Sequence, residues 1–261
     1  MEIKAPTFSR LDQNQFFRTL NKRVNDYFKE NNLKKTGNWK LHLKTIIMFT
    51  LLFAPFIAIF FIPVSIWIYL LASVVIGIGM AGVGMNVMHD GNHGSYSTKN
   101  WLNKIMGGSI YILAGNVYNW QVQHNVLHHT YTNIPGHDED LDAGRVIRFT
   151  KEAKWYSFHK FQHYYSIFLY GLLTINWCLT TDFKQMGAYL KRKLSYGNTP
   201  NPKTLWTGLV ISKIVYFGFW IVLPLIFGTA SWWVILLGFF IMHYTAGLIL
   251  SVVFQLAHII D

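Results

Sequence analysis

The sequence predicts an all-α integral membrane protein with four transmembrane helices in two hairpins, interfacial helices and a cytoplasmic, histidine-rich cap. Three observations predict this fold class. Residues 45–88 contain no charged side chain and no histidine, and residues 205–257 are interrupted only by Lys213 and His243. Hydrophobic residues make up 52% of the 261 residues. Charged residues make up only 13%, about half of their usual share in a globular domain, which leaves too little polar surface to wrap such helices.

Each apolar stretch is long enough for two spans. As one helix, the 44 residues of 45–88 would measure roughly 66 Å, about twice the thickness of a bilayer core. The tripeptide Pro63-Val64-Ser65 can form a tight connection in this stretch, and residues 227–231 supply a turn in the second one. The predicted spans are therefore 45–62, 66–88, 205–227 and 232–254.

The basic residues predict the orientation of the chain. Residues 1–44 hold ten Lys and Arg against four acidic residues, and the loop 182–204 holds five against one. Cytoplasmic segments carry such an excess, so both belong on the cytoplasmic side. The net charge of +11 is then an orientation signal, and a surface for anionic lipid or a coenzyme A phosphate, rather than a nucleic-acid footprint.

Two shorter apolar segments, 105–118 and 164–181, are predicted to be interfacial or re-entrant. The first is too short to span a bilayer comfortably, and a crossing by the second would move the basic loop after it to the outside. We therefore predict a single membrane domain over 1–261. Its parts are a cytoplasmic N-terminal segment (1–44), a transmembrane hairpin (45–88), a histidine-rich cytoplasmic or interfacial region (89–204) and a second hairpin (205–257).

Five of the eleven histidines fall into two groups with helical spacing. His89 and His93 are four residues apart, and so are His124 and His128, with His129 adjoining. Residues i and i+4 project from one face of a helix, so each group can hold a metal ion. The predicted topology brings both groups, together with His258 at the end of the fourth span, to the cytoplasmic level of the membrane.

Six convergent imidazoles predict two metal ions, because a tetrahedral zinc site takes only four ligands. Imidazole suits zinc, copper, iron and nickel. Asp90 and the acidic run 138–142 are candidate hydrogen-bond partners for metal-bound histidines. We predict no catalytic side chain beyond the metal ligands and no binding site for an organic cofactor. The predicted metal ligands are His89, His93, His124, His128, His129 and His258.

Three other polar groups are predicted to be structural. His159 and His163 are also four residues apart, but we interpret them as structural or as partners of the metal ligands. His243 lies about 15 residues before His258, roughly 22 Å along a helix, so it is expected to pair inside the helix bundle. Lys213 is expected to snorkel or to pair with an inward-facing partner.

Three sequence phrases carry a resemblance to a known family. They are His89-Asp-Gly-Asn-His93, His124-Asn-Val-Leu-His-His129 and Phe254-Gln-Leu-Ala-His258. They resemble the histidine boxes and the late extra histidine of the membrane fatty acid desaturases, in particular the bacterial acyl-CoA or acyl-lipid branch that is similar to front-end enzymes. The resemblance covers nearly the whole chain.

The resemblance implies two non-haem iron ions, held mainly by histidines, that activate O2. The implied reaction introduces a cis double bond into an acyl-CoA or acyl-lipid chain. No Gly-x-Gly-x-x-Gly motif stands before a strand, and the sequence has no cysteine cluster for iron–sulfur and no fused haem domain of recognisable form. Electrons are therefore expected from a separate ferredoxin or small cytochrome. The expected surroundings are the lipid bilayer, with N-terminus and metal site on the cytoplasmic side, and no nucleic acid.

One departure from the family pattern concerns the end of the chain. The family carries a third box, Gln/His-x-x-His-His, well after the late histidine, and this sequence stops at Asp261. We therefore expect that a C-terminal part is missing and that desaturation by this chain is impaired. The alternatives are a related di-iron hydroxylase or ketolase, a non-catalytic histidine-ligated membrane cytochrome, and a structural remnant.

Overall fold

Four long helices form the body of the protein. The computed structural model describes residues 6 and 15–258, with the side chains of Ala257 and His258 excepted. Four helices in it are long and apolar enough to cross a membrane. They are α2 (Trp39–Phe61), the continuous helix Ile66–Asn92, the helix Pro202–Phe227, and α13 (Trp232–His258), of which Trp232–Leu256 is the candidate span. The four predicted spans are confirmed.

The second and third spans are each built from several helical pieces. The second comprises α3 (Ile66–Gly82), the π-helical η1 (Val83–Met88) and α4 (His89–Asn92). The third comprises α11 (Pro202–Phe217), the π-helical η7 (Gly218–Val222) and α12 (Leu223–Phe227). These pieces run on from one another, so the spans stay unbroken.

The first span begins earlier than the sequence predicts. Helix α2 starts at Trp39 and not near residue 45, because the Asn38 side chain accepts a hydrogen bond from the Lys40 backbone N–H and caps the helix there. Lys40 and Lys44 therefore lie on the first turns of the spanning helix. Their basic side chains are placed at the end of the span that adjoins the histidine groups.

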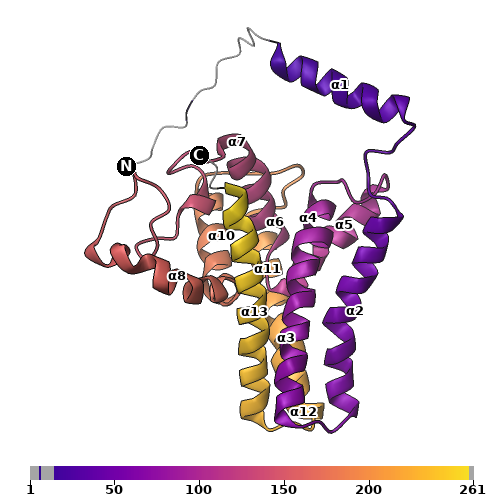
Figure 1. The fold of residues 1–261 in the computed structure, drawn as a ribbon, viewed down its shortest axis with the longest axis vertical. Coiled ribbons are helices and arrows are strands. Elements are labelled where there is room, and N and C mark those ends of the chain that lie inside the picture. The colour runs from indigo at the N-terminus through magenta and orange to yellow at the C-terminus, as the bar shows by residue number, and fades with distance from the viewer. Residues whose placement is uncertain (1–5, 7–14, 259–261) are drawn as a thin grey trace.

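The spans pack side by side, with both hairpin turns at one end and the histidine-bearing segments at the other (Figure 1). Helix α3 packs between α2 and α13. Two glycines allow its close approach: an added Cβ at Gly79 would lie 2.5 Å from the Leu52 backbone nitrogen, and one at Gly77 would lie 2.5 Å from the Met242 carbonyl oxygen. This glycine-rich stretch therefore serves helix packing.

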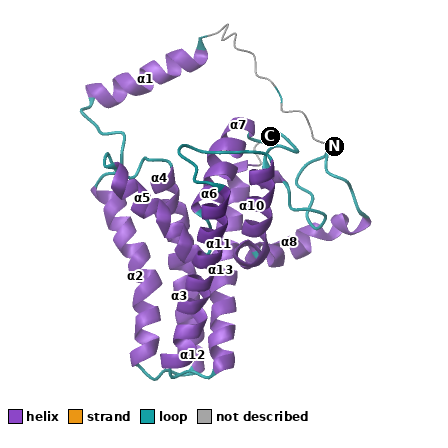
Figure 2. Cartoon of the chain, turned by 180° about the vertical axis from the view of Figure 1, so that it is seen from behind, coloured by secondary structure: helices purple, strands orange, loops and turns teal. Residues whose placement is uncertain are grey.

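Shorter helices make up the rest of the described chain, which contains helices and loops and no strand (Figure 2). Helix α1 lies apart from the bundle (Figure 1). Helix α8 lies across the upper part of α13 (Figure 1). The α-helices are α1 (Phe16–Glu30), α5 (Asn100–Gly108), α6 (Val117–Trp120), α7 (His129–Tyr131), α8 (Gln162–Gly171), α9 (Leu173–Asn176) and α10 (Asp182–Lys191). The 3₁₀ and π segments are η2 (Ser109–Leu113), η3 (Gln121–His128), η4 (Glu139–Leu141), η5 (Ser157–Phe161) and η6 (Trp177–Thr181).

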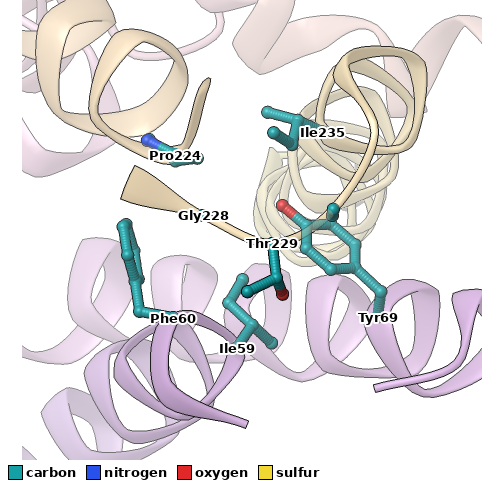
Figure 3. Close-up of a pocket in the computed structure, with 8 residues that line it drawn as sticks. Ile59, Phe60, Tyr69, Pro224, Gly228, Thr229 and Ile235 are labelled. Atoms are coloured by element: carbon teal, nitrogen blue, oxygen red, sulfur yellow. The ribbon is translucent and has the colours of Figure 1, made fainter. Parts of the chain in front are cut away.

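The end of the bundle that carries the hairpin turns contains a small apolar pocket (Figure 3). Its walls include Ile59 of α2, Tyr69 of α3, Pro224 of α12 and Ile235 of α13. Tyr69 precedes His89 by 20 residues of continuous helix, or about 30 Å. The pocket and the histidine groups therefore lie at opposite ends of the spans.

Candidate metal centre

The first histidine group stands at the cap end of the second span. His89 and His93 follow the π-helical η1, and their ring centroids are 4.5 Å apart. The buried Asn92 fixes this turn, because its amide donates to the Gly107 carbonyl and its Oδ1 accepts from Gln121 Nε2 at 3.1 Å. Gln121 begins the segment that carries the second histidine group, so one asparagine joins the two groups.

The second histidine group lies on a π-helical segment. In η3 the backbone hydrogen bonds run from i to i+5, so residues four and five positions apart both stay on one side. The ring centroid of His124 is accordingly 5.3 Å from that of His128 and 4.7 Å from that of His129. An α-helix would turn His129 away, and the sequence analysis gave no indication of the π-helix.

The two groups converge on one another across the cap. His93 Nε2 and His124 Nε2 are 3.1 Å apart, and the ring centroids of His93 and His129 are 5.0 Å apart. Ligand atoms of His89, His93 and His124 all lie within 4.8 Å of one another. A second set, His124, His128 and Asp140, meets the same limit. The five predicted histidines of the first and second groups therefore come together, and His124 belongs to both sets.

The electrostatics of the cluster favour neutral imidazoles at most positions. Burial, and then the neighbouring histidines, lower the pKa of His93 to about 4 and that of His124 to about 2. Burial also lowers the pKa of His129. His128 differs, because its hydrogen bond to Asp138 raises its pKa. A neutral imidazole offers a lone pair to a metal ion, so His93, His124 and His129 are in the ligating form at neutral pH.

A buried carboxylate orients His128. Asp138 is 1% exposed, accepts hydrogen bonds from the backbone N–H groups of Asn133 and Asp140, and lies 3.1 Å from His128 Nδ1. With Nδ1 held by Asp138, the other ring nitrogen of His128 is left to face the cluster. The sequence analysis placed such a partner in the run 138–142, but it predicted Asp140 only as a partner and not as a member of a ligand set.

Helix α10 holds the acidic loop in place. Tyr189 donates to Glu139 Oε2 at 2.5 Å, and Gln185 Nε2 donates to the same oxygen at 3.1 Å. Gln123, on η3 itself, donates to Asp140 Oδ1 at 2.6 Å. The loop is therefore tied both to α10 and to the helix whose histidines it contacts.

Trp120 packs against the histidine cluster. It is 5% exposed and stacks on His124, with ring centroids 4.5 Å apart and planes 28° apart. It also makes T-shaped contacts with His89 and His93, with ring centroids 5.7 Å apart in both pairs. Trp120 is therefore held against both histidine groups.

The sixth predicted ligand, His258, is the last residue of α13, and its side chain lies outside the described residues. Two other histidines have protein partners on both ring nitrogens. His159 accepts from the Tyr156 backbone N–H at 3.1 Å and lies 2.9 Å from the Arg145 carbonyl oxygen. His243 lies between hydroxyl groups of Tyr216 and Thr174. Both therefore serve the fold.

The chemistry of the donor set fits a pair of first-row metal ions. Five imidazoles and the Asp140 carboxylate converge, and the closest approach between the two groups is between two ring nitrogens. Nitrogen-rich sites of this kind suit iron, zinc and copper. A cation could bind to the lone pairs of both nitrogens in place of a hydrogen bond between the two rings.

Comparisons with known proteins agree with this arrangement. A family described as "Fatty acid desaturase" matches residues 65–260. The chain is 32% identical over 247 residues to the sn-1 linoleoyl-lipid 6-desaturase of Arthrospira platensis, covering 94% of this chain and 66% of that protein. Its identity to the protein of the same name from Synechocystis sp. is also 32%, over 248 residues, covering 94% of this chain and 68% of that protein. No solved structure matches.

A more distant relative extends the comparison to plants. The chain is 29% identical over 260 residues to the acyl-lipid (8-3)-desaturase of Physcomitrium patens, covering 97% of this chain and 53% of that protein. The chain thus spans about two thirds of the length of the two cyanobacterial relatives and about half of the moss protein. With its four apolar helices and its two histidine groups, the chain is a membrane protein that belongs to the fatty acid desaturase family.

Proposed function

We propose that this protein introduces a cis double bond into a lipid-linked acyl chain, with two non-haem iron ions bound at the histidine cluster. The observation that carries the proposal is the convergence of five imidazoles from two distant segments, in a chain of the fatty acid desaturase family. The names of the cyanobacterial and moss relatives specify acyl chains linked to lipids, which supports a lipid-linked substrate.

The overall reaction defines what the protein must supply. Removing two hydrogens from a –CH2–CH2– pair, with reduction of O2 to two waters, takes two electrons and two protons in addition. Iron supplies the activation of O2, and a separate ferredoxin or small cytochrome supplies the electrons. His89, His93, His124, His128 and His129 would hold the iron, joined by His258 and Asp140.

The remaining task of the chain is to position the substrate. Neighbouring methylenes differ little in reactivity, so the carbons that react are those held closest to the metal. Trp120, which is buried and stacks on His124, is a candidate contact for the acyl chain. The excess of basic residues in the N-terminal segment and in the 182–204 loop supports a cytoplasmic location for this end of the protein.

Metal analysis of the purified full chain tests the proposed iron site. We expect about two iron ions per chain and no Soret band. A Soret band would identify a haem cytochrome, and less than about one iron per chain would identify a protein without the centre.

Fatty acid profiling tests the reaction itself. The chain is expressed in a host with an intact ferredoxin system, and the lipids are analysed by gas chromatography and mass spectrometry. A new double bond that disappears with His93→Ala would support the proposal. A new hydroxyl group instead of a double bond would show the related hydroxylase chemistry. No new product, in a protein that binds two irons, would contradict desaturation by this chain.

A further inference from the structure

The helix that carries the second histidine group begins at a break inside the protein. Helix α5 continues into η2, which ends at Leu113, and α6 begins at Val117. Between them Ala114 has a left-handed backbone with φ of 64°, and Asn116 caps the new helix by accepting from the Asn119 backbone N–H. The direction of the helix that bears His124 is therefore set at this break.

The break is anchored by a lysine from the third span. Lys213 lies eleven residues after Pro202 on α11, roughly 17 Å into the span. Its ammonium group donates to the Ala114 carbonyl and, at 2.6 Å, to Asp182 Oδ2. Irregular backbone at membrane depth is tolerated only where protein groups satisfy it, and Lys213 does so here.

The partner of this lysine reaches on towards the histidines. Asn119 Nδ2 donates to the backbone oxygen of Asp182 at 2.8 Å and to its Oδ1 at 3.0 Å. The next residue, Trp120, stacks on His124. A continuous series of contacts thus runs from Lys213 through Asp182, Asn119 and Trp120 to the histidine that both ligand sets share.

The pair is buried, and the surrounding packing leaves little freedom at the break. Lys213 is 5% exposed and Asp182 0%. An added Cβ at Gly115 would lie 2.6 Å from Ile110 Cγ1 and 3.0 Å from Trp177, so the backbone is closely enclosed. Replacing such a pair by apolar groups is often neutral or stabilising, so stability alone does not account for two charges here.

We propose that Lys213 and Asp182 are positioning residues that fix the broken helix, and with it His124 and Trp120, at the place where the metal ligands converge. This inference rests on the proposed metal site. The pair touches neither metal nor substrate, and acts through Asn119 and the Ala114 carbonyl.

Cobalt binding to full-chain protein in nanodiscs tests the proposal. In the variant Lys213→Met/Asp182→Leu both charges are removed together, so neither is left buried alone. We expect this variant to keep its helical circular dichroism and unfolding midpoint. We also expect it to bind Co²⁺ about tenfold more weakly, because the loss of contacts that support metal ligands typically has an effect of this size. Its d–d absorption spectrum should change as well.

Two further variants separate positioning from general stability. Tyr216→Phe is the matched control, because Tyr216 is also a buried polar residue of α11, but its hydroxyl contacts His243 of α13, which in turn contacts Thr174 of α9. The Co²⁺ affinity and spectrum of this variant should equal those of the parent. Asn119→Ala leaves the ion pair intact and breaks only the link to α6, so it should weaken Co²⁺ binding as the double variant does.

The outcomes are distinct. The inference is overturned if the folded double variant binds Co²⁺ with the affinity and spectrum of the parent. If the double variant does not fold, the same result with Asn119→Ala overturns it. A parent protein that binds no Co²⁺ would instead contradict the proposed metal site itself.

Discussion

Two regions of this molecule hold partly or fully buried histidines, and the partners of those histidines differ. In the cap, His93 Nε2 faces His124 Nε2 at 3.1 Å. Inside the bundle, His243 Nε2 faces the Tyr216 hydroxyl at 2.6 Å and its Nδ1 faces the Thr174 hydroxyl at 3.0 Å. A ring whose two nitrogens meet hydroxyl groups has no nitrogen left for a metal ion, whereas rings that turn their nitrogens toward one another can share a cation. Burial alone therefore does not distinguish a metal site from a structural histidine, but the partner atoms do.

The largest contrast is expected from removing the histidine that both ligand sets share. His124→Ala should reduce iron or cobalt affinity by at least about 100-fold, above the effect of losing a supporting contact. Isothermal titration with Co²⁺ measures it. His243→Gln is the comparison variant and should keep the affinity of the parent. Equal losses in the two variants would erase the distinction between the regions.

A smaller effect is expected at the carboxylate that orients His128. Asp138→Asn removes the negative charge at 3.1 Å from His128 Nδ1, so metal affinity should fall about tenfold. Asp142→Asn is the control, since Asp142 is exposed and its side chain accepts from the Gly144 backbone N–H. Competition with a chromophoric chelator gives both affinities. An unchanged affinity in Asp138→Asn would show that His128 is oriented without this carboxylate.

The pH dependence of metal binding should reflect one histidine rather than several. His93 and His124, with pKa values lowered to about 4 and about 2, are already neutral at pH 5.5, where an ordinary histidine would be about nine-tenths protonated. His128 has a raised pKa, so it must lose a proton to bind. Affinity should therefore fall as the pH falls from 7 to 5.5, chiefly because His128 becomes protonated.

Calorimetry in buffers of different ionisation enthalpy counts the protons released. We expect about one proton per cluster at pH 6, and Asp138→Asn should reduce that number. Release of three or more protons would mean that the cluster histidines titrate as they do in water.

The smallest expected effect is at the structural histidine. Tyr216→Phe removes one hydrogen bond to His243 and should lower the free energy of unfolding by about 1 kcal/mol. Denaturation followed by circular dichroism measures it, with Phe217→Leu as a variant of the neighbouring residue that keeps the hydrogen bond. A loss of metal in Tyr216→Phe would join the two regions into one functional unit.

The sequence was sufficient to predict the spans and the two histidine groups. Charge-free runs mark bilayer-spanning helices directly, and the spacing of His89 and His93 places both rings on one helical face. His129 was predicted as a metal ligand, but its place beside His124 was not, because the π-helical turn that brings it there has no sequence signal of its own. The side chain of His258 lies outside the described residues, so its place in the ligand set stays a prediction.

The link between the third span and the cap could be predicted only in outline. An intramembrane lysine snorkels or pairs with an inward-facing partner, and these were the two roles predicted for Lys213. Its identity depends on tertiary structure: Asp182 is 31 positions away and the Ala114 carbonyl 99. The backbone break at 114–116 that makes this carbonyl available follows from the packing of Gly115 against Ile110 and Trp177, which no local pattern encodes.

The π-helical turns before and within the histidine groups make this centre sensitive to chain length as much as to composition. Deleting one residue between His124 and His128, such as Val126, would keep all five histidines of the cap cluster. It would leave His128 three and His129 four residues after His124, a spacing at which side chains of an α-helix still share one face. Inserting one residue there has no such compensation and would turn His128 and His129 by about 100° around the axis. An insertion in this short stretch should therefore be far less tolerated than a deletion or a substitution at Val126 itself, because the π-helical turn already holds one residue more than an α-helix would.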